Sequence, residues 1–154
     1  MKIAELTCYL NESRQIYLEG NGYKTTPGRW HVNNPESTVD LINGIYKGNR
    51  LPEEHAWMLC LDNRSKVIGI FEATKGNATT TIMPIREICR NALLVNAVGV
   101  VLVHNHPTGD ATPSDIDVAT TVELKNAMKT IGITLCDHII IGDTYCSMKE
   151  DAYI

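Results

Sequence analysis

The stretch that decides the fold spans residues 97–117 and reads AVGVVLVHNHPTGDATPSDID. Its first eight residues form a continuous apolar run, which is typical of a central strand buried on both faces. A loop with proline and glycine follows. We expect a helix to begin after this loop, with Thr112 as its N-cap and Pro113 at the first helical position. The segment therefore predicts a strand, a short loop and a helix in direct succession.

Three side chains of this segment form a candidate metal site. In an extended chain residues i and i+2 point to the same side, so His104 and His106 can turn both imidazoles toward one point. Ser114 and Asp117 are spaced i, i+3 on the expected helix and share a face that can look back at the strand end. Two histidines and one carboxylate leave a fourth position for water, which is the arrangement of a catalytic zinc site.

Such a site also needs a general base and a group that stabilises the oxyanion. We expect Glu72 to be the base, because it lies at the end of the apolar strand KVIGIFEA and is the only carboxylate there. Ser114 is the expected hydroxyl donor to the oxyanion. Simpler interpretations stand beside these: Glu72 as a strand-end residue facing water, and Ser114 and Asp115 as ordinary residues of a helix first turn.

Other polar residues are harder to assign. Asp137 and His138 interrupt the apolar strand ITLCDHIIIG. They either support the metal site from behind its ligands or close a buried polar pair, and both interpretations stay open. His31 and His55 stand beside polar loop residues, and we predict no role for them.

The remaining chain predicts one domain of residues 34–154 with an N-terminal extension of residues 1–33 that holds two short strands. Asn34 and Pro35 are typical of a helix start, and that helix should end near Gly48. Two strands, HAWMLCLD and KVIGIFEA, form a hairpin, Pro84 opens a second helix, and YCSMKEDAYI adds an edge strand. We therefore expect an α/β or α+β three-layer sandwich, in which helices flank a central mixed sheet.

The composition of the 154 residues narrows the class of partner. The net charge of -4 offers no general attraction for nucleic acid or for an anionic membrane. No apolar run approaches the roughly 20 residues that span a bilayer, and the N-terminus does not read as a signal peptide, so we expect a cytoplasmic protein. The five cysteines are odd in number and have no CxxC spacing, which favours reduced thiols.

The motif resembles that of a known family. His104, Asn105, His106 and Pro107, with Ser114 seven residues after the proline and Asp117 three further on, resemble the JAMM motif of JAB/MPN metalloproteases. The stretches HAWMLCLDNRSKVIG, REICRNALLVNAVGVVLVHNHPTGD and CDHIIIGD resemble the RadC-like branch of that superfamily. The resemblance covers about three quarters of the chain.

The resemblance implies a cytidine-deaminase-like sandwich and an amide-cleaving zinc enzyme with a peptide or protein substrate. It makes His104, His106 and Asp117 the zinc ligands, Glu72 the acid/base that acts through the metal-bound water, and Ser114 the oxyanion partner. Two features depart from the family. Residues 1–33 are too short and dissimilar for its N-terminal helix-hairpin-helix region, and MPIRE replaces a His-Pro-Arg-Glu run. A DNA-repair or nucleic-acid-processing protein and a non-catalytic binding module are the alternatives.

Overall fold

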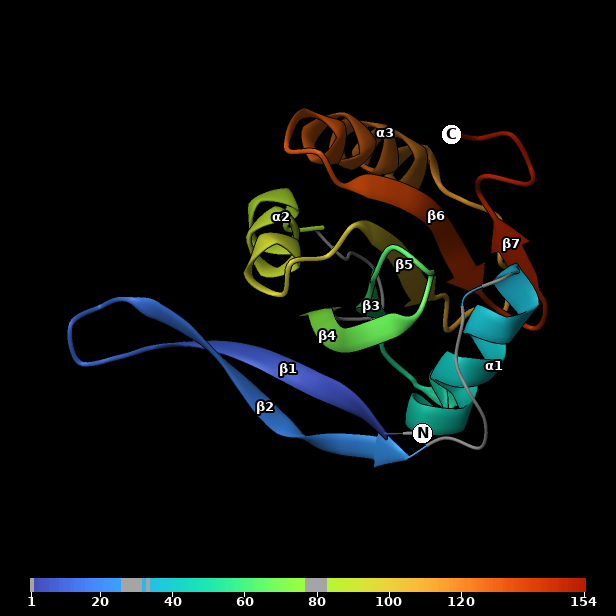
Figure 1. Cartoon of the computed structure of the whole chain (residues 1–154). Helices are drawn as coiled ribbons and strands as arrows, with labels where there is room; N and C mark the ends of the chain where they lie inside the picture. Colours follow the sequence, from blue (N-terminus) through green and yellow to red (C-terminus); the bar gives the residue numbers. More distant parts are fainter. Residues whose placement is uncertain (1, 26–31, 33, 77–82) are drawn as a thin grey trace.

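A seven-stranded mixed sheet forms the centre of the structure, a computed structural model that describes residues 2–25, 32, 34–76 and 83–154 (Figure 1). The strands are β1 Lys2–Leu10, β2 Ile16–Thr25, β3 His55–Leu61, β4 Val67–Lys75, β5 Gly99–Asn105, β6 Thr134–Ile141 and β7 Tyr145–Ser147. Their order in the sheet is β2-β1-β4-β3-β5-β6-β7. The pairs β1/β4 and β5/β6 are parallel, and the other pairs are antiparallel.

Three helices in the described part of the chain cover the two faces of this sheet, and a 3-10 turn follows the first of them. They are α1 Pro35–Tyr46, the turn η1 Gly48–Arg50, α2 Ile85–Leu94 and α3 Asp115–Thr130. Helix α1 packs Leu41 and Ile42 against one face, while α2 and α3 lie on the other (Figure 1). This confirms the predicted α/β class with helices on either side of a mixed sheet.

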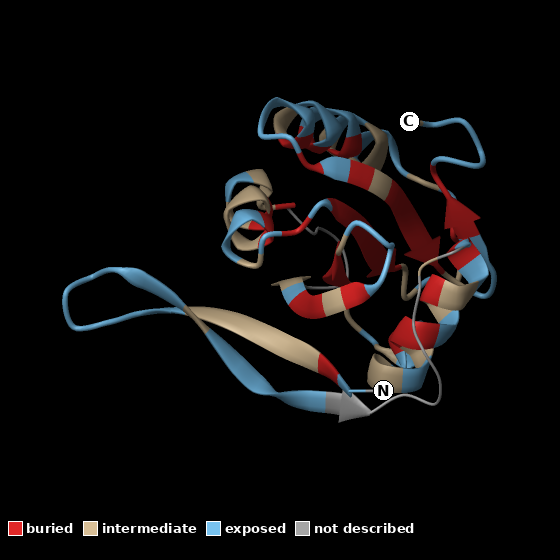
Figure 2. Cartoon of the chain, viewed as in Figure 1, coloured by how far each residue is buried: buried red, intermediate tan, exposed pale blue. Residues whose placement is uncertain are grey.

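Strand β5 lies near the middle of the sheet, and all seven of its residues are buried, as Figure 2 shows. Its side chains alternate between two apolar clusters because successive strand residues point to opposite faces. Val101 and Val103 pack with α1, whereas Val100 and Leu102 pack with α2 and α3. The prediction of a central strand buried on both faces is confirmed, and His104 follows Leu102 on the face of α3.

The N-terminal segment departs from the expectation of two short strands. Strands β1 and β2 have 9 and 10 residues and form a hairpin that extends from the body, with its tip exposed (Figure 2). The hairpin joins the sheet through the pair Glu5 and Ile70. Gly69 leaves room for the Leu6 side chain, because a Cβ at that position would overlap the end of that side chain. Polar residues alternate along this hairpin, and for this reason the sequence predicted shorter strands than the structure has.

The helix starts were predicted with mixed success. Asn34 caps α1 through a bond from Ser37 N, and Pro35 is the first helical residue, as expected. The expected N-cap of α3 at Thr112 is wrong, because Ser114 is the N-cap and α3 begins at Asp115. Helix α3 therefore begins two residues later than predicted. The edge strand β7 is confirmed.

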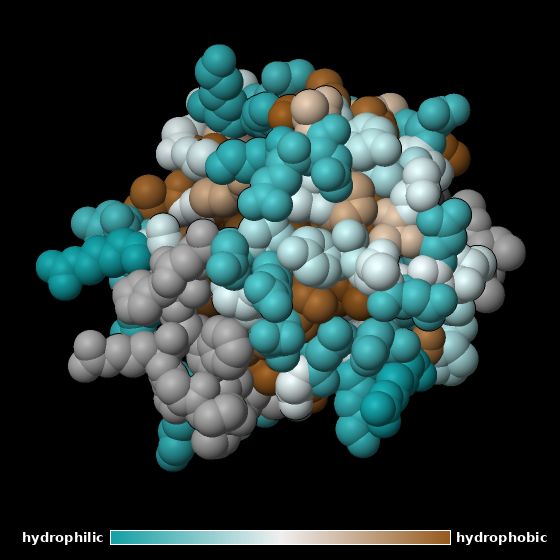
Figure 3. Space-filling view, turned by 90° about the vertical axis from the view of Figure 1, so that its right-hand side faces the viewer, coloured by the Kyte–Doolittle hydropathy of each residue, from teal (hydrophilic) through white to brown (hydrophobic). Residues whose placement is uncertain are grey.

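The described chain contains no helix long and apolar enough to cross a membrane. All five cysteines are free thiols, as the sequence indicated. His31 lies outside the described residues. Figure 3 views the side on which α1 and β7 lie, where the surface is mostly hydrophilic and its apolar areas are small and separate.

Candidate metal centre

The imidazoles of His104 and His106 and the carboxylate of Asp117 converge where β5 ends and α3 begins. The two Nε2 atoms lie 3.0 Å apart. Asp117 Oδ1 lies 3.5 Å from His104 Nε2, and Asp117 Oδ2 lies 3.6 Å from His106 Nε2. This is the one group of potential metal ligands found among the described residues. The structure thus brings together the three residues that the sequence predicted as ligands.

The loop after β5 holds the ring of His106 in one orientation. His106 N donates to Ile141 O at 2.8 Å, and His106 Nδ1 lies 2.7 Å from Asp110 O. A carbonyl oxygen only accepts, so in the neutral ring Nδ1 carries the proton and Nε2 presents its lone pair. Gly109 has a φ of 85°, and Gly142 packs against its carbonyl so closely that a Cβ would collide with it. Glycine at both positions therefore lets this loop fold back on the strand end.

Ser114 holds the carboxylate of Asp117 in a capping box at the start of α3. Asp117 Oδ2 accepts bonds from Ser114 N at 2.8 Å and from Ser114 Oγ at 2.6 Å, while Ser114 Oγ accepts from Asp117 N at 3.1 Å. A hydroxyl has one proton, and Ser114 donates it to Asp117. Ser114 therefore lies in the site and orients a ligand, while its role as oxyanion donor stays a prediction.

The electrostatic environment differs between the two histidines. Burial lowers the pKa of His104 to about 4, because its side chain is only 4% exposed. Asp117 raises the pKa of His106, because its carboxylate can accept a hydrogen bond from the protonated ring, and this acts against the effect of partial burial. Burial alone would raise the pKa of Asp117, but bonds from His106 and Ser114 and the nearby His104 lower it below its usual value. His104 is therefore neutral and Asp117 ionised near pH 7, as metal binding requires.

Glu72, the predicted base, is not part of this group. Its neighbours Phe71 and Ala73 pack on the α2 and α3 side of the sheet, so Glu72 projects from the α1 side. Its Oε1 lies 2.5 Å from Nδ1 of His55, and after burial and Glu5 it contributes to the raised pKa of Tyr46 in α1. The contacts of Glu72 therefore lead to His55, for which we predicted no role, and its role as base stays a prediction.

A different carboxylate, Glu54, lies beside the metal centre. Ala56 of β3 pairs with His104 in antiparallel register, so two residues further out Glu54 comes opposite His106 on the same face of the sheet. The charge of Glu54 raises the pKa of His106. Its backbone is anchored by the bond from Gly76 N to Glu54 O at 2.9 Å. Sequence reasoning missed Glu54 because its position depends on β3 and β5 being neighbours, although β4 and α2 separate them in the chain.

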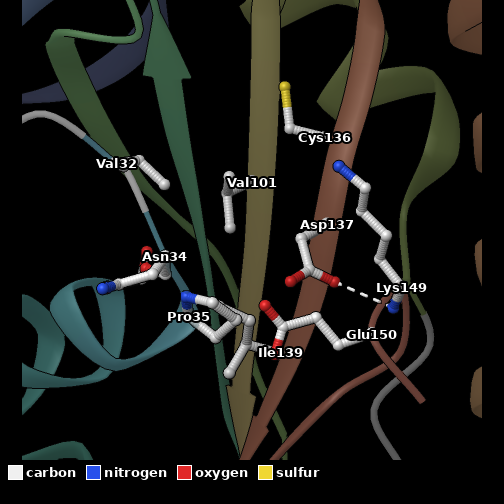
Figure 4. Close-up of a pocket in the computed structure, with 10 residues that line it drawn as sticks. Val32, Asn34, Pro35, Val101, Cys136, Asp137, Ile139, Lys149 and Glu150 are labelled. Atoms are coloured by element: carbon white, nitrogen blue, oxygen red, sulfur yellow. Dashed lines mark hydrogen bonds between the residues drawn. The ribbon is translucent and has the colours of Figure 1, made fainter.

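Asp137 and His138 point to opposite faces of the sheet, and each fits one of the two open interpretations. His138 is fully buried, and its Nε2 lies 2.7 Å from Nδ1 of His104. Asp137 lines a cavity of about 150 Å³ on the α1 side, shown in Figure 4. Its carboxylate accepts bonds from Ser147 Oγ at 2.6 Å and Lys149 N at 3.1 Å. His138 thus supports a ligand, while Asp137 closes a buried polar network.

The donor set fits a zinc ion. Histidine nitrogens and a carboxylate oxygen are zinc ligands, and at a bond length of about 2.1 Å tetrahedral ligand atoms lie about 3.4 Å apart. The two Nε2 atoms lie 3.0 Å apart, and the Asp117 oxygen nearer to each lies 3.5 Å from one and 3.6 Å from the other, which is close to that value. These atoms are all electron-pair donors, and they would repel one another without a cation or a proton between them. The residues present can therefore hold a metal ion.

The mixed sheet, the His-x-His pair at the end of its central strand and the acid in the next helix define a domain of metallohydrolase type. A sequence model of the RadC-like JAB domain matches residues 32–153. The chain therefore belongs to the RadC-like JAB domain family.

Relatives with broad coverage carry the name UPF0758 protein, which states no activity. The protein of Methanococcoides burtonii is 38% identical over 120 residues, covering 77% of this chain and 52% of the relative. That of Caldanaerobacter subterraneus is 33% identical over 153 residues, covering 99% of this chain and 63% of the relative. That of Clostridium botulinum is 36% identical over 146 residues, covering 94% and 60%. The chain thus spans about half to two thirds of the length of these relatives.

Proposed function

We propose that this chain is a zinc-dependent hydrolase that cleaves an amide bond as a peptidase or isopeptidase. The observation that carries the proposal is the convergence of His104 Nε2, His106 Nε2 and the Asp117 carboxylate. The two nitrogens lie 3.0 Å apart, and they lie 3.5 and 3.6 Å from Asp117 Oδ1 and Oδ2, respectively. Three protein ligands are the number found in catalytic zinc sites, whereas structural sites have four. When bound there, zinc lowers the pKa of a coordinated water to about 7 and polarises a carbonyl.

The exposure of the ligands supports a reacting site. The side chain of His104 is 4% exposed, but those of His106 and Asp117 are 14% and 19% exposed. Solvent and substrate can therefore approach from the side of His106 and Asp117, while His104 forms the back of the site. A polar cavity of about 110 Å³, lined by His106, Thr108 and Asp143 among others, adjoins His106 and offers room for the part of the substrate next to the scissile bond.

Glu54 is the general base that this geometry favours. Because it lies across from His106 on the same face, its carboxylate can accept the proton of the attacking water and pass it to the leaving amine. Asn105 supports this arrangement, since its Oδ1 accepts from His55 N at 2.7 Å and its Nδ2 donates to Glu53 O at 3.0 Å. These bonds tie the residues on both sides of Glu54 to the strand end that carries His106.

The charges around the site favour a peptide or protein substrate over a nucleic acid. Glu54 acts electrostatically on His106, and His106 in turn acts on Asp110. Asp143 lines the adjoining cavity. Carboxylates at these positions repel phosphate groups, and the net charge of -4 supplies no compensating attraction.

The test is amide hydrolysis by the zinc-loaded protein on a fluorogenic peptide library and on isopeptide-linked peptides. We expect cleavage that requires one zinc per chain, stops on chelation and returns when zinc is added. The proposal is contradicted if zinc binds at one equivalent and no amide in either set is cleaved, or if cleavage continues in full after chelation.

A further inference from the structure

A buried chain of hydrogen bonds connects two of the proposed ligands behind the metal centre. His104 Nδ1 lies 2.7 Å from His138 Nε2, and His138 Nδ1 lies 2.6 Å from Thr121 Oγ1. Thr121 Oγ1 in turn lies 2.5 Å from the backbone oxygen of Asp117, one helical turn earlier in α3. His138 and Thr121 are both completely buried. The chain thus begins at the ring of one ligand and ends at the backbone of another.

The position of every proton in this series of hydrogen bonds follows from the contact between Thr121 Oγ1 and the Asp117 carbonyl. Two oxygens at 2.5 Å repel each other unless a proton lies between them, and the Asp117 carbonyl has none to give. Thr121 therefore donates its one proton to that carbonyl. The Met148 sulfur, 3.7 Å from Thr121 Oγ1, is a much weaker acceptor and does not compete. Thr121 Oγ1 is then left to act only as an acceptor.

The histidines must follow this direction. Since Thr121 only accepts, His138 Nδ1 carries a proton and donates it. Complete burial favours the neutral form of His138, so its Nε2 bears a lone pair. That lone pair accepts from His104 Nδ1, which therefore carries the single ring proton of a neutral His104. The Nε2 of His104 is left without a proton, facing His106 and Asp117.

We propose that Thr121 and His138 are positioning residues that fix His104 in its Nδ1-H tautomer and so present its Nε2 lone pair for metal binding. This inference rests on the proposed metal site. A free neutral imidazole exists in both tautomers, and the Nε2-H form cannot bind a metal at Nε2. Helix α3 thereby sets two ligands at once: it carries the carboxylate of Asp117, and through Thr121 it selects the tautomer of His104.

The first test is nitrogen-15 NMR of the histidine rings in the metal-free wild-type chain near neutral pH. We expect His104 and His138 to give the pattern of a neutral ring with the proton on Nδ1. A proton on Nε2 of His104 would overturn the inference. The measurement needs neither zinc nor substrate, so its outcome is independent of the proposed function.

The second test is the zinc affinity of Thr121→Val, measured by competition with a fluorescent chelator. Valine has the shape of threonine but lacks its hydroxyl, so His138 Nδ1 loses its hydrogen-bond acceptor while the side-chain packing remains. We expect zinc affinity to fall by about 10-fold to 100-fold, the range for lost partners of metal-binding histidines. Thr121→Ser, which restores the hydroxyl, should recover most of the affinity.

Thr120→Val is the matched control. Thr120 Oγ1 makes the same kind of bond to Ile116 O, at 2.7 Å, but Thr120 is only partly buried, and this is its one side-chain hydrogen bond among the described residues. Its loss should change zinc affinity less than about 2-fold. The inference is overturned if Thr121→Val binds zinc as tightly as wild type, or if Thr120→Val weakens binding equally. Failure of the wild type to bind zinc would count instead against the proposed function.

Discussion

Two histidine-carboxylate groups lie on opposite faces of the same sheet, and only one of them has the character of a metal centre. On the α3 face, Asp110, His138 and Ser114 bind the far sides of the three ligands, so the electron pairs of those ligands converge. On the α1 face, Nδ1 of His55 lies 2.5 Å from Oε1 of Glu72, so the two side chains bind each other instead of presenting free electron pairs to one point. The comparison shows that the direction of hydrogen-bond donors, and not the presence of imidazole and carboxylate, distinguishes a metal centre from a structural pair.

The largest expected effect is a loss of turnover, and it distinguishes Glu54 from Glu72 as the general base. Glu54→Gln should lower the turnover of zinc-loaded protein by about 10²-fold to 10⁴-fold, because glutamine cannot accept the proton of the attacking water. Glu72→Gln should lower it by less than about 10-fold, because Glu72 lies on the α1 face. Steady-state kinetics measures both, and zinc content should stay at one equivalent in each variant.

The opposite order of turnover losses would assign the general base to Glu72. If Glu72→Gln lost turnover as severely as we expect of Glu54→Gln, the base would be the residue that the strand-end position indicated, and the two faces would not be separate in function.

Zinc affinity is the next test of the difference between the faces. Asp117→Asn should weaken binding at least 100-fold, because it replaces an anionic ligand by a neutral amide. Asp115→Asn, two residues earlier on the exposed side of α3, is the matched control and should change affinity by less than about 3-fold. His55→Gln should also retain zinc. Calorimetric titration measures all three, and zinc loss in His55→Gln would contradict the separation.

Zinc should stabilise the protein against unfolding only when the ligands on the α3 face are intact. A ligand at 100 times its dissociation constant adds about 2.7 kcal/mol to the free energy of unfolding. For a chain of this length that corresponds to about 5 to 10 °C in melting temperature. Wild type and His55→Gln should show this shift on zinc addition, and His104→Ala should not. A shift of equal size in His104→Ala would mean that zinc binds elsewhere.

The smallest expected effect concerns the start of α3. Ser114→Ala should reduce the free energy of unfolding by about 1 kcal/mol, because it removes the N-cap. Thr112→Ala, at the position first expected to be the cap, should change it by less than about 0.5 kcal/mol. Denaturant unfolding of the metal-free variants measures both. Equal losses of unfolding free energy in the two variants would contradict the assignment of Ser114 as the sole N-cap.

Local sequence patterns predicted much of this molecule. The buried run before His104, the Asn34-Pro35 helix start and the i, i+2 spacing of the histidines each depend on near neighbours in the chain, and the structure agrees with them. Residues that depend on strand order were missed. Glu54 comes beside His106 only because β3 pairs with β5, and Glu72 faces α1 only because of where β4 lies.

The prediction of the α3 N-cap was wrong for a different reason. Thr112-Pro113 and Ser114-Asp115 are both acceptable helix starts, and the choice falls to Ser114 because its hydroxyl also binds Asp117. The strands β1 and β2 were underestimated because their exposed faces carry polar residues, and their pairing with each other and with β4 supplies what local propensity lacks.

The central claim is that His104, His106 and Asp117 form a zinc site, and metal analysis of the purified chain tests it most directly. The protein would be purified without chelators, supplied with zinc, and compared with His106→Ala by mass spectrometry of bound metal. We predict one zinc per wild-type chain and less than about a tenth of that in His106→Ala. Wild type without zinc after this treatment, or full zinc in His106→Ala, would contradict the account.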